Sequence, residues 1–111
     1  DLEQTAERLQ DLTSRARAGT LTPKDVQGGT FTISNHGVSG SLVATPIVIN
    51  QPQSAILGIG KLENRVVADP NGVPVVRPRM YVTLTIDHRV LDGFQANAFL
   101  TRWVETIESW A

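Results

Sequence analysis

The chain has no cysteine among its 111 residues. This absence excludes disulfides, thiolate metal ligands and a cysteine nucleophile. It also lacks an excess of either charge, since ten basic and eleven acidic residues leave a formal charge of −1. No apolar run approaches the roughly 18 residues of a membrane helix, and no basic start leads into a hydrophobic segment. We therefore expect no nucleic-acid partner and no membrane partner.

The length suits one small domain, and the apolar two-fifths of the residues are enough for a core. Amphipathic helices are predicted at both ends. The first, within residues 1–21, ends near Gly19 and aligns Leu2, Ala6, Leu9, Leu12 and Ala16. The last follows Gly93 through residues 94–111, with an apolar stripe of Ala96, Phe99, Leu100, Trp103 and Ile107. We expect both stripes to pack against the core. Thr22-Pro23 predicts one helical turn after the first helix.

Strands are predicted between the helices. Residues 30–35 alternate, which predicts Phe31 and Ile33 on the core face. The opposite face carries the hydroxyls of Thr30, Thr32 and Ser34. This face is either a solvated surface or the polar wall of a site.

Further along, the apolar run 54–60 is typical of a strand buried on both faces. Residues 61–68 and 73–79 predict a hairpin around the turn at 69–72, and residues 81–86 alternate again. The order α, β, β, hairpin, β, α indicates an α/β fold, a two-layer domain with a mixed sheet.

His88 is one of only two histidines, and it follows the strand 81–86 just before the turn Asp92-Gly93. Rigid elements on both sides fix a side chain at such a place. An imidazole titrates near neutral pH, so a fixed one can accept a proton and return it. Spacing alone leaves two interpretations open, a catalytic base or a hydrogen-bonded structural residue.

Two other site interpretations are weak. The segment Gly37–Gly40 is rich in glycine, but no Gly-Lys-Ser/Thr follows and the spacing fits no dinucleotide fingerprint. A phosphate- or nucleotide-binding module therefore rests on that loop alone. We predict no metal site, including one that would join His36 to His88.

Three segments carry a resemblance to a known family. The string DHRVLDG at residues 87–93 resembles the catalytic signature of the dihydrolipoamide acyltransferases, the core components of 2-oxo acid dehydrogenase complexes. GGTFTISN at 28–35 resembles the strand that ends in the family's oxyanion-stabilising hydroxyl, and residues 40–67 resemble the segment that follows it. The resemblance runs through nearly the whole chain. It covers only the C-terminal half of the family's catalytic domain.

The resemblance implies a chloramphenicol acetyltransferase-like fold, incomplete here, with helices on one face of a mixed sheet. It implies that His88 removes the proton from the attacking thiol and that Ser34 stabilises the oxyanion without acting as a nucleophile. Asp92 either orients His88 as in a triad or, as we favour, supports the loop through an ion pair.

Three further residues are expected to support the site. Arg89 would hold the turn, and Asn35 flanks Ser34. Gly93 would supply a backbone conformation that a Cβ resists. His36 stands where the family has smaller residues, and Asp87 has no role that follows from the sequence.

The implied activity is transfer of an acyl group between dihydrolipoamide and coenzyme A, with succinyl favoured over acetyl or branched-chain groups. Coenzyme A is then a substrate, and the lipoyl group is carried on a domain outside this chain. The implied partners are two more copies, as a homotrimer within a larger core, and the dehydrogenase and dihydrolipoamide dehydrogenase components. The setting would be a bacterial cytoplasm, which we favour, or a mitochondrial matrix.

The alternative is an inert, core-forming fragment of that assembly. We expect the 111 residues to be the C-terminal half of the catalytic domain, without the lipoyl domain, the subunit-binding domain or the first catalytic half.

Overall fold

The computed structural model describes residues 1–110, which form two compact units, Asp1–Thr30 and the chain from Phe31 onward. The first unit contains helix α1 (Leu2–Arg17) and the single turn η1 (Pro23–Asp25), both as predicted. Asp1 caps α1 by accepting a hydrogen bond from the Gln4 N–H. The apolar stripe of α1 is not buried, since Leu2 and Leu9 are each about two-thirds exposed.

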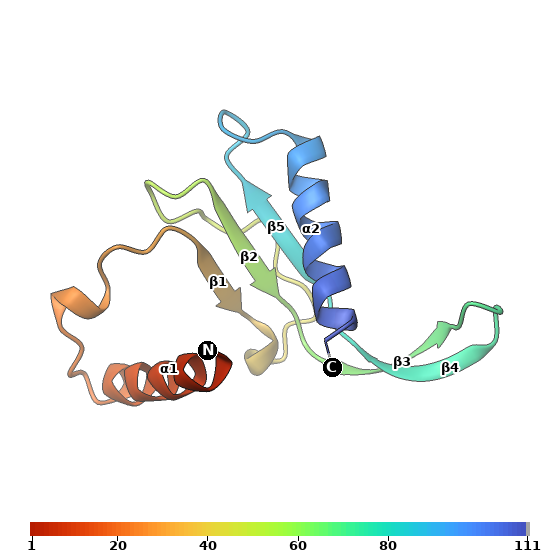
Figure 1. Ribbon diagram of the computed structural model, residues 1–111, viewed down its shortest axis with the longest axis horizontal. Helices are drawn as coiled ribbons and strands as arrows, with labels where there is room; N and C mark the ends of the chain where they lie inside the picture. Colours follow the sequence, from red (N-terminus) through yellow and green to blue (C-terminus); the bar gives the residue numbers. More distant parts are fainter. Residues whose placement is uncertain (111) are drawn as a thin grey trace. The chain divides into compact units, whose positions relative to one another are not determined.

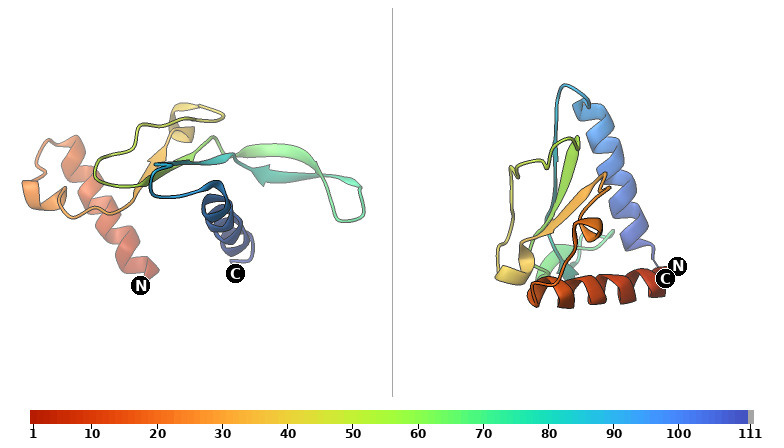
Figure 2. Two further views of the ribbon diagram at one scale, coloured as in Figure 1. Left: turned by 90° about the horizontal axis from the view of Figure 1, so that it is seen from above. Right: turned by 90° about the vertical axis from the view of Figure 1, so that its left-hand side faces the viewer.

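The second unit is built on a mixed sheet, as predicted, and this sheet has three strands. Strand β2 (Ala55–Ile59) lies at its centre, parallel to β1 (Thr32–Asn35) and antiparallel to β5 (Val82–Ile86). Helix α2 (Gly93–Glu108) packs on one face (Figures 1 and 2), where the Phe31 and Phe99 rings lie 5.8 Å apart. The predicted helix extended to Ala111, which lies outside the described residues.

Segment 41–53 covers the opposite face of this sheet, as Figure 2 shows. It is attached through strand hydroxyls. Thr83 donates a hydrogen bond to the Ala44 carbonyl at 2.6 Å, and the hydroxyl of Thr85 accepts one from the Ile47 N–H at 3.1 Å. With α2 on one side and this segment on the other, β2 is buried on both faces, and Leu57 is fully inaccessible. The prediction for residues 54–60 is therefore confirmed.

Phe31 and Ile33 share the face of the sheet on which α2 packs, but their predicted burial is wrong. Ile33 is 60% exposed and Phe31 is 41% exposed, whereas Thr32 and Ser34 are half-buried. The reason is the position of β1 at the edge of the sheet. Helix α2 lies against β5, at the other edge, and leaves most of this face of β1 open. Segment 41–53 instead covers the hydroxyl face, where Thr32 donates to the Gln53 side-chain oxygen at 2.6 Å.

The hairpin is present as β3 (Glu63–Ala68) and β4 (Pro74–Arg79). Its first strand begins two residues later than predicted, because Gly60 still continues the pairing of the three-stranded sheet. The Gly60 N–H donates a hydrogen bond to the Tyr81 carbonyl there. An ion pair between Arg79 and Glu108 joins the end of β4 to the end of α2. No helix within residues 1–110 has the length and apolar character needed to cross a membrane.

Candidate active site

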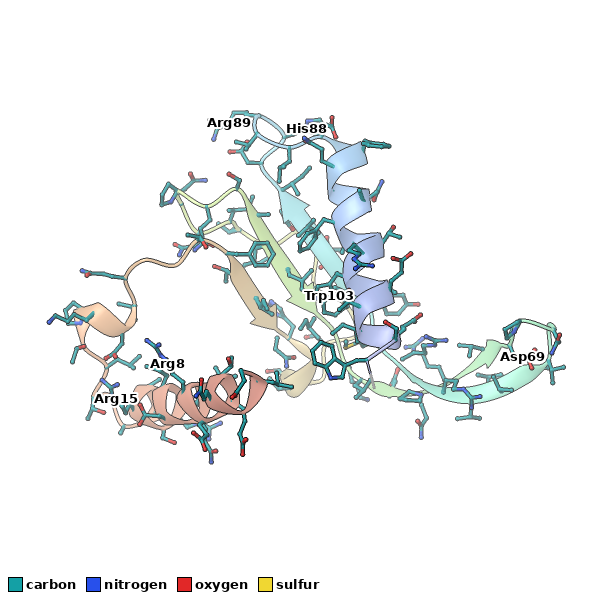
Figure 3. The ribbon with its side chains drawn as sticks, in the orientation of Figure 1. Arg8, Arg15, Asp69, His88, Arg89 and Trp103 are labelled. Atoms are coloured by element: carbon teal, nitrogen blue, oxygen red, sulfur yellow. The ribbon has the colours of Figure 1, made fainter. Side chains whose placement is uncertain are left out.

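His88 lies in the turn between β5 and α2, with its side chain exposed (Figure 3). The turn is ordered by the backbone of Asp87, whose carbonyl accepts hydrogen bonds from the N–H groups of Val90 and Leu91. The Asp87 N–H in turn donates to the Ser54 carbonyl at 2.8 Å, which continues the pairing of β5 with β2 past the strand end. The imidazole therefore stands on a fixed backbone and is open to an incoming molecule.

Asp87 and Arg89 clamp this turn from either side of His88. The Arg89 Nε donates to Asp87 Oδ1 at 2.9 Å, its Nη2 donates to Oδ2 at 2.7 Å, and its backbone N–H also reaches Oδ1. These bonds from Arg89 lower the Asp87 pKa from 3.8 to about 2 and raise the pKa of Arg89. Arg89 thus bonds across the turn, and Asp87 is its partner, a residue that the sequence reasoning missed.

Asp92 caps α2. Its carboxylate accepts a hydrogen bond from the Gln95 N–H at 2.8 Å, and the Gln95 side chain accepts one from the Asp92 N–H at 3.1 Å. Within the described residues, Asp92 makes no hydrogen bond to His88 and forms no ion pair. This geometry favours structural support over the orienting interpretation, and the support seen within these residues is a helix cap.

The reason given for Gly93 is wrong. Its φ is not positive, and a Cβ built there would meet no atom within 4 Å. Gly93 occupies the first position of α2, which any residue with ordinary helical backbone angles can take. The site therefore does not need a glycine at this position for backbone reasons.

Ser34 lies near the end of β1, half-buried, and its Oγ is 3.0 Å from Nε2 of His36. Asn35, next to it, is exposed, and its side-chain oxygen accepts a long hydrogen bond of 3.4 Å from the Val38 N–H. Asn35 thus contacts the loop after the strand, and its support of the site stays a prediction. The Ser34–His36 contact was not foreseen, although strand alternation places residues two apart on the same face.

The loop Gly37–Gly40 does not form a phosphate cradle. Residues Gly37–Ser39 make one short 3₁₀ turn, η2. A Cβ on Gly37 would lie 2.3 Å from the Gly60 carbonyl oxygen, so this glycine is needed for close packing of two backbone segments. In the described part of the chain, no group of three or more histidine, aspartate or glutamate side chains is placed to hold a metal ion.

Ser34 and His88 lie at opposite ends of the sheet. Ser34 pairs with Gly58, which pairs with Thr83, whereas β5 continues to Ile86 before the histidine turn. Ser34 and Ile86 are therefore separated by three residues along the strand direction and by two strand spacings across the sheet. Together these displacements place their backbones about 14 Å apart, and His88 lies beyond the end of β5. One copy of the chain does not bring the two side chains together.

Comparison with known proteins identifies the family. The model for the catalytic domain of the 2-oxoacid dehydrogenases acyltransferase matches residues 1–111. The chain belongs to this family. Its mixed α/β fold is that of the family's catalytic cores, and the resemblance inferred from three sequence segments is confirmed.

One curated relative is the dihydrolipoyllysine-residue succinyltransferase component of the 2-oxoglutarate dehydrogenase complex from Rickettsia bellii. It is 51% identical over 98% of this chain and 26% of its own length. A solved structure of the dihydrolipoamide acetyltransferase of Azotobacter vinelandii is 36% identical, with a TM-score of 0.85 over 98% of this chain and 44% of that one. A structure of the cubic core of the pyruvate dehydrogenase multienzyme complex is 35% identical with the same TM-score and coverage. The chain thus spans about a quarter of that curated relative and less than half of these solved chains.

Proposed function

We propose that the protein containing this chain is a dihydrolipoamide acyltransferase in which His88 is the base and Ser34 the oxyanion donor. The observation that carries the proposal is an exposed imidazole on a clamped turn, in a chain of this family. The Azotobacter vinelandii structure was determined to examine a serine, a histidine and an asparagine four residues after the histidine in that enzyme's catalytic mechanism. This chain has a serine at position 34 and a histidine at position 88. Four residues after His88 it has Asp92 where that enzyme has the asparagine.

The reaction needs few groups from the protein. His88 accepts the proton of the attacking thiol, whose reference pKa near 8.5 leaves it mostly protonated at neutral pH. The thiolate adds to the thioester carbonyl, and the resulting oxyanion accepts a hydrogen bond from the Ser34 hydroxyl. The carbonyl re-forms as the other sulfur leaves and takes the proton from His88. Acyl-serine formation is not required, because the acyl group already arrives as a thioester.

The active site is formed between two copies of the chain. The opposite positions of Ser34 and His88 in the sheet support this arrangement, because neither residue can complete the site within its own subunit. A symmetric assembly can place the histidine turn of one copy next to β1 of the neighbouring copy. We propose a trimer as this unit, within a larger core such as the cubic one formed by the pyruvate dehydrogenase relative.

The acyl group is succinyl. The 51% identity to a succinyltransferase component supports this choice, compared with 36% to the acetyltransferase structure. Coenzyme A is one substrate, and the other is a dihydrolipoyl group carried on a domain outside these residues. The dehydrogenase and dihydrolipoamide dehydrogenase components would complete the assembly, and the chemistry requires no metal.

The test is thioester exchange between succinyl-coenzyme A and dihydrolipoamide, measured with the full-length protein and its His88→Ala variant. We expect kcat to fall by about 10²–10⁴-fold, the contribution of a positioned base. Val90→Ala is the matched control, because Val90 is an exposed residue of the same turn and makes no side-chain hydrogen bond. Full activity in His88→Ala would refute the proposed function.

The 111 residues as a separate polypeptide are expected to be inactive. Several apolar side chains are open to solvent, among them Val48 at 91% and Phe94 at 84% exposure, which fits a piece that is covered by further protein. The same exchange assay on this polypeptide tests the point, and wild-type activity there would show that no further chain is needed.

A further inference from the structure

His36 is the one imidazole that the proposed reaction does not use. It is half-buried, and its Nε2 lies 3.0 Å from the Ser34 Oγ, within hydrogen-bonding distance. Ser34 and His36 are two residues apart at the end of β1, so their side chains leave the strand on the same side. The contact joins His36 to the hydroxyl proposed to stabilise the oxyanion.

The backbone holds His36 firmly in this position. Its N–H donates to the Ile59 carbonyl at 2.9 Å, which extends the β1–β2 pairing by one residue. Its carbonyl accepts hydrogen bonds from the N–H groups of Ser39 and Ser41, at 3.1 and 3.3 Å. Because both Ser34 and His36 are fixed by main-chain bonds, the Oγ–Nε2 contact is a built feature of the strand end.

The direction of this hydrogen bond decides what Ser34 can do. A serine hydroxyl has one hydrogen to donate and two lone pairs to accept. If Nε2 accepts, the hydroxyl hydrogen is used within the pair and none is left for an oxyanion. If Nε2 carries the proton and donates, a lone pair of Ser34 is used and its hydrogen is free to point toward a substrate.

We propose that His36 is a positioning residue for acyl transfer, whose Nε2–H donates to Ser34 Oγ and so directs the Ser34 hydroxyl hydrogen to the oxyanion. The inference rests on the proposed function, and it adds a residue to which neither the catalytic assignments nor the relatives' names give a role. His36 does not touch the reacting atoms. It acts through Ser34, by fixing the oxygen in place and by selecting the direction of its one hydrogen.

The kinetic test uses a double-variant cycle in the full-length protein. His36→Leu removes the donor and is expected to lower kcat about 3- to 10-fold, the size of one neutral hydrogen bond, with KM for succinyl-coenzyme A and for dihydrolipoamide unchanged. His36→Gln keeps an N–H donor and should recover most of the loss. In a Ser34→Ala background, His36→Leu should change kcat less than about twofold, because the group through which it acts is already gone.

Two kinetic results would overturn the proposal. A loss from His36→Leu that is equally large with and without Ser34 would show a general structural effect. A change confined to KM would show that His36 contacts a substrate directly. Glutamine rescue together with non-additivity supports the positioning role, since a merely structural histidine would give neither.

Nitrogen NMR of histidine-labelled full-length protein tests the hydrogen-bond direction without any turnover, with the His36 signals assigned from the His36→Gln spectrum. We expect a proton on Nε2 that shifts in the Ser34→Ala variant. An unprotonated Nε2 would overturn the proposal even if His88→Ala is inactive. Conversely, full activity in His88→Ala with a protonated Nε2 would refute the proposed function while leaving the Ser34–His36 bond in place.

Discussion

Replacement of Asp92 separates two roles that the sequence alone leaves open. In the structure its carboxylate caps α2 by accepting from the Gln95 N–H at 2.8 Å, and His88 is not among its partners. Asp92→Asn keeps a side-chain oxygen that can accept this bond and removes the negative charge. Asp92→Ala removes both. The pair of variants therefore distinguishes a helix cap from a carboxylate that orients the imidazole.

The two roles predict effects of different size. Loss of an N-cap costs about 0.5–2 kcal/mol, and asparagine caps about as well as aspartate. The missing charge at the helix start adds less than about 1 kcal/mol to the cost of Asp92→Asn. By contrast, replacing the aspartate of a catalytic triad with asparagine lowers kcat by about 10⁴-fold. The two roles therefore predict effects of Asp92→Asn on kcat that differ by several orders of magnitude.

The assay combines succinyl-coenzyme A exchange with amide hydrogen exchange of the full-length protein. We expect Asp92→Asn to keep activity within about threefold of wild type, as a cap replacement should. In Asp92→Ala, the Gln95 amide should exchange about fivefold faster, which corresponds to about 1 kcal/mol of local opening. A loss of several thousandfold in Asp92→Asn, with unchanged amide protection, would show that the carboxylate itself acts on His88.

Two further substitutions test the packing and the clamp. Gly58→Ala should lower the free energy of unfolding by about 1–3 kcal/mol, because the new Cβ would meet the Ile47 and Thr83 side chains at 2.6 Å. In the control Gly93→Ala, the new Cβ meets no atom, so this variant should be neutral or slightly stabilising. Urea unfolding of both variants measures the two effects, and equal effects would contradict the packing described for segment 41–53. Asp87 has its pKa lowered to about 2 by Arg89, so the stability that it contributes is present above its ordinary pKa and is lost as the pH falls through the lowered one. The stability difference between wild type and Asp87→Asn should therefore narrow from about pH 4 toward pH 2 in urea unfolding at stepped pH, and a pH-independent difference would show that the clamp is not electrostatic.

Much of the fold follows from local patterns in the sequence. The apolar run 54–60 predicts a strand covered on both faces, and β2 is that strand. The turn residues at 69–72 locate the hairpin because aspartate, proline and glycine each favour turn geometry, and the Asp69 side chain indeed accepts from two backbone N–H groups there.

The errors arise where a distant element decides the outcome. Alternation identifies the two faces of β1 correctly, but it cannot tell how far α2 will cover the apolar face, and Ile33 is exposed because the helix lies against the other edge of the sheet. Asp87 was missed, although aspartate commonly bonds the N–H two residues on, and the spacing Asp-x-Arg at a strand end carries that signal.

In the candidate site, too, some features follow from local sequence patterns and others depend on distant elements. The position of His88 between strand and helix follows from the sequence, and so does the shared face of Ser34 and His36. The separation of Ser34 from His88 depends on the order and direction of three strands, which no local pattern specifies.

Subunit mixing tests the central claim most directly. Ser34→Ala and His88→Ala full-length proteins are each expected to be nearly inactive. If the site joins the histidine of one copy to the serine of the next in a trimer, every mixed trimer regains one intact site of three, and equal co-assembly restores about a quarter of wild-type activity. Mixtures that stay as inactive as the two separate variants, despite verified co-assembly, would contradict a site shared between subunits.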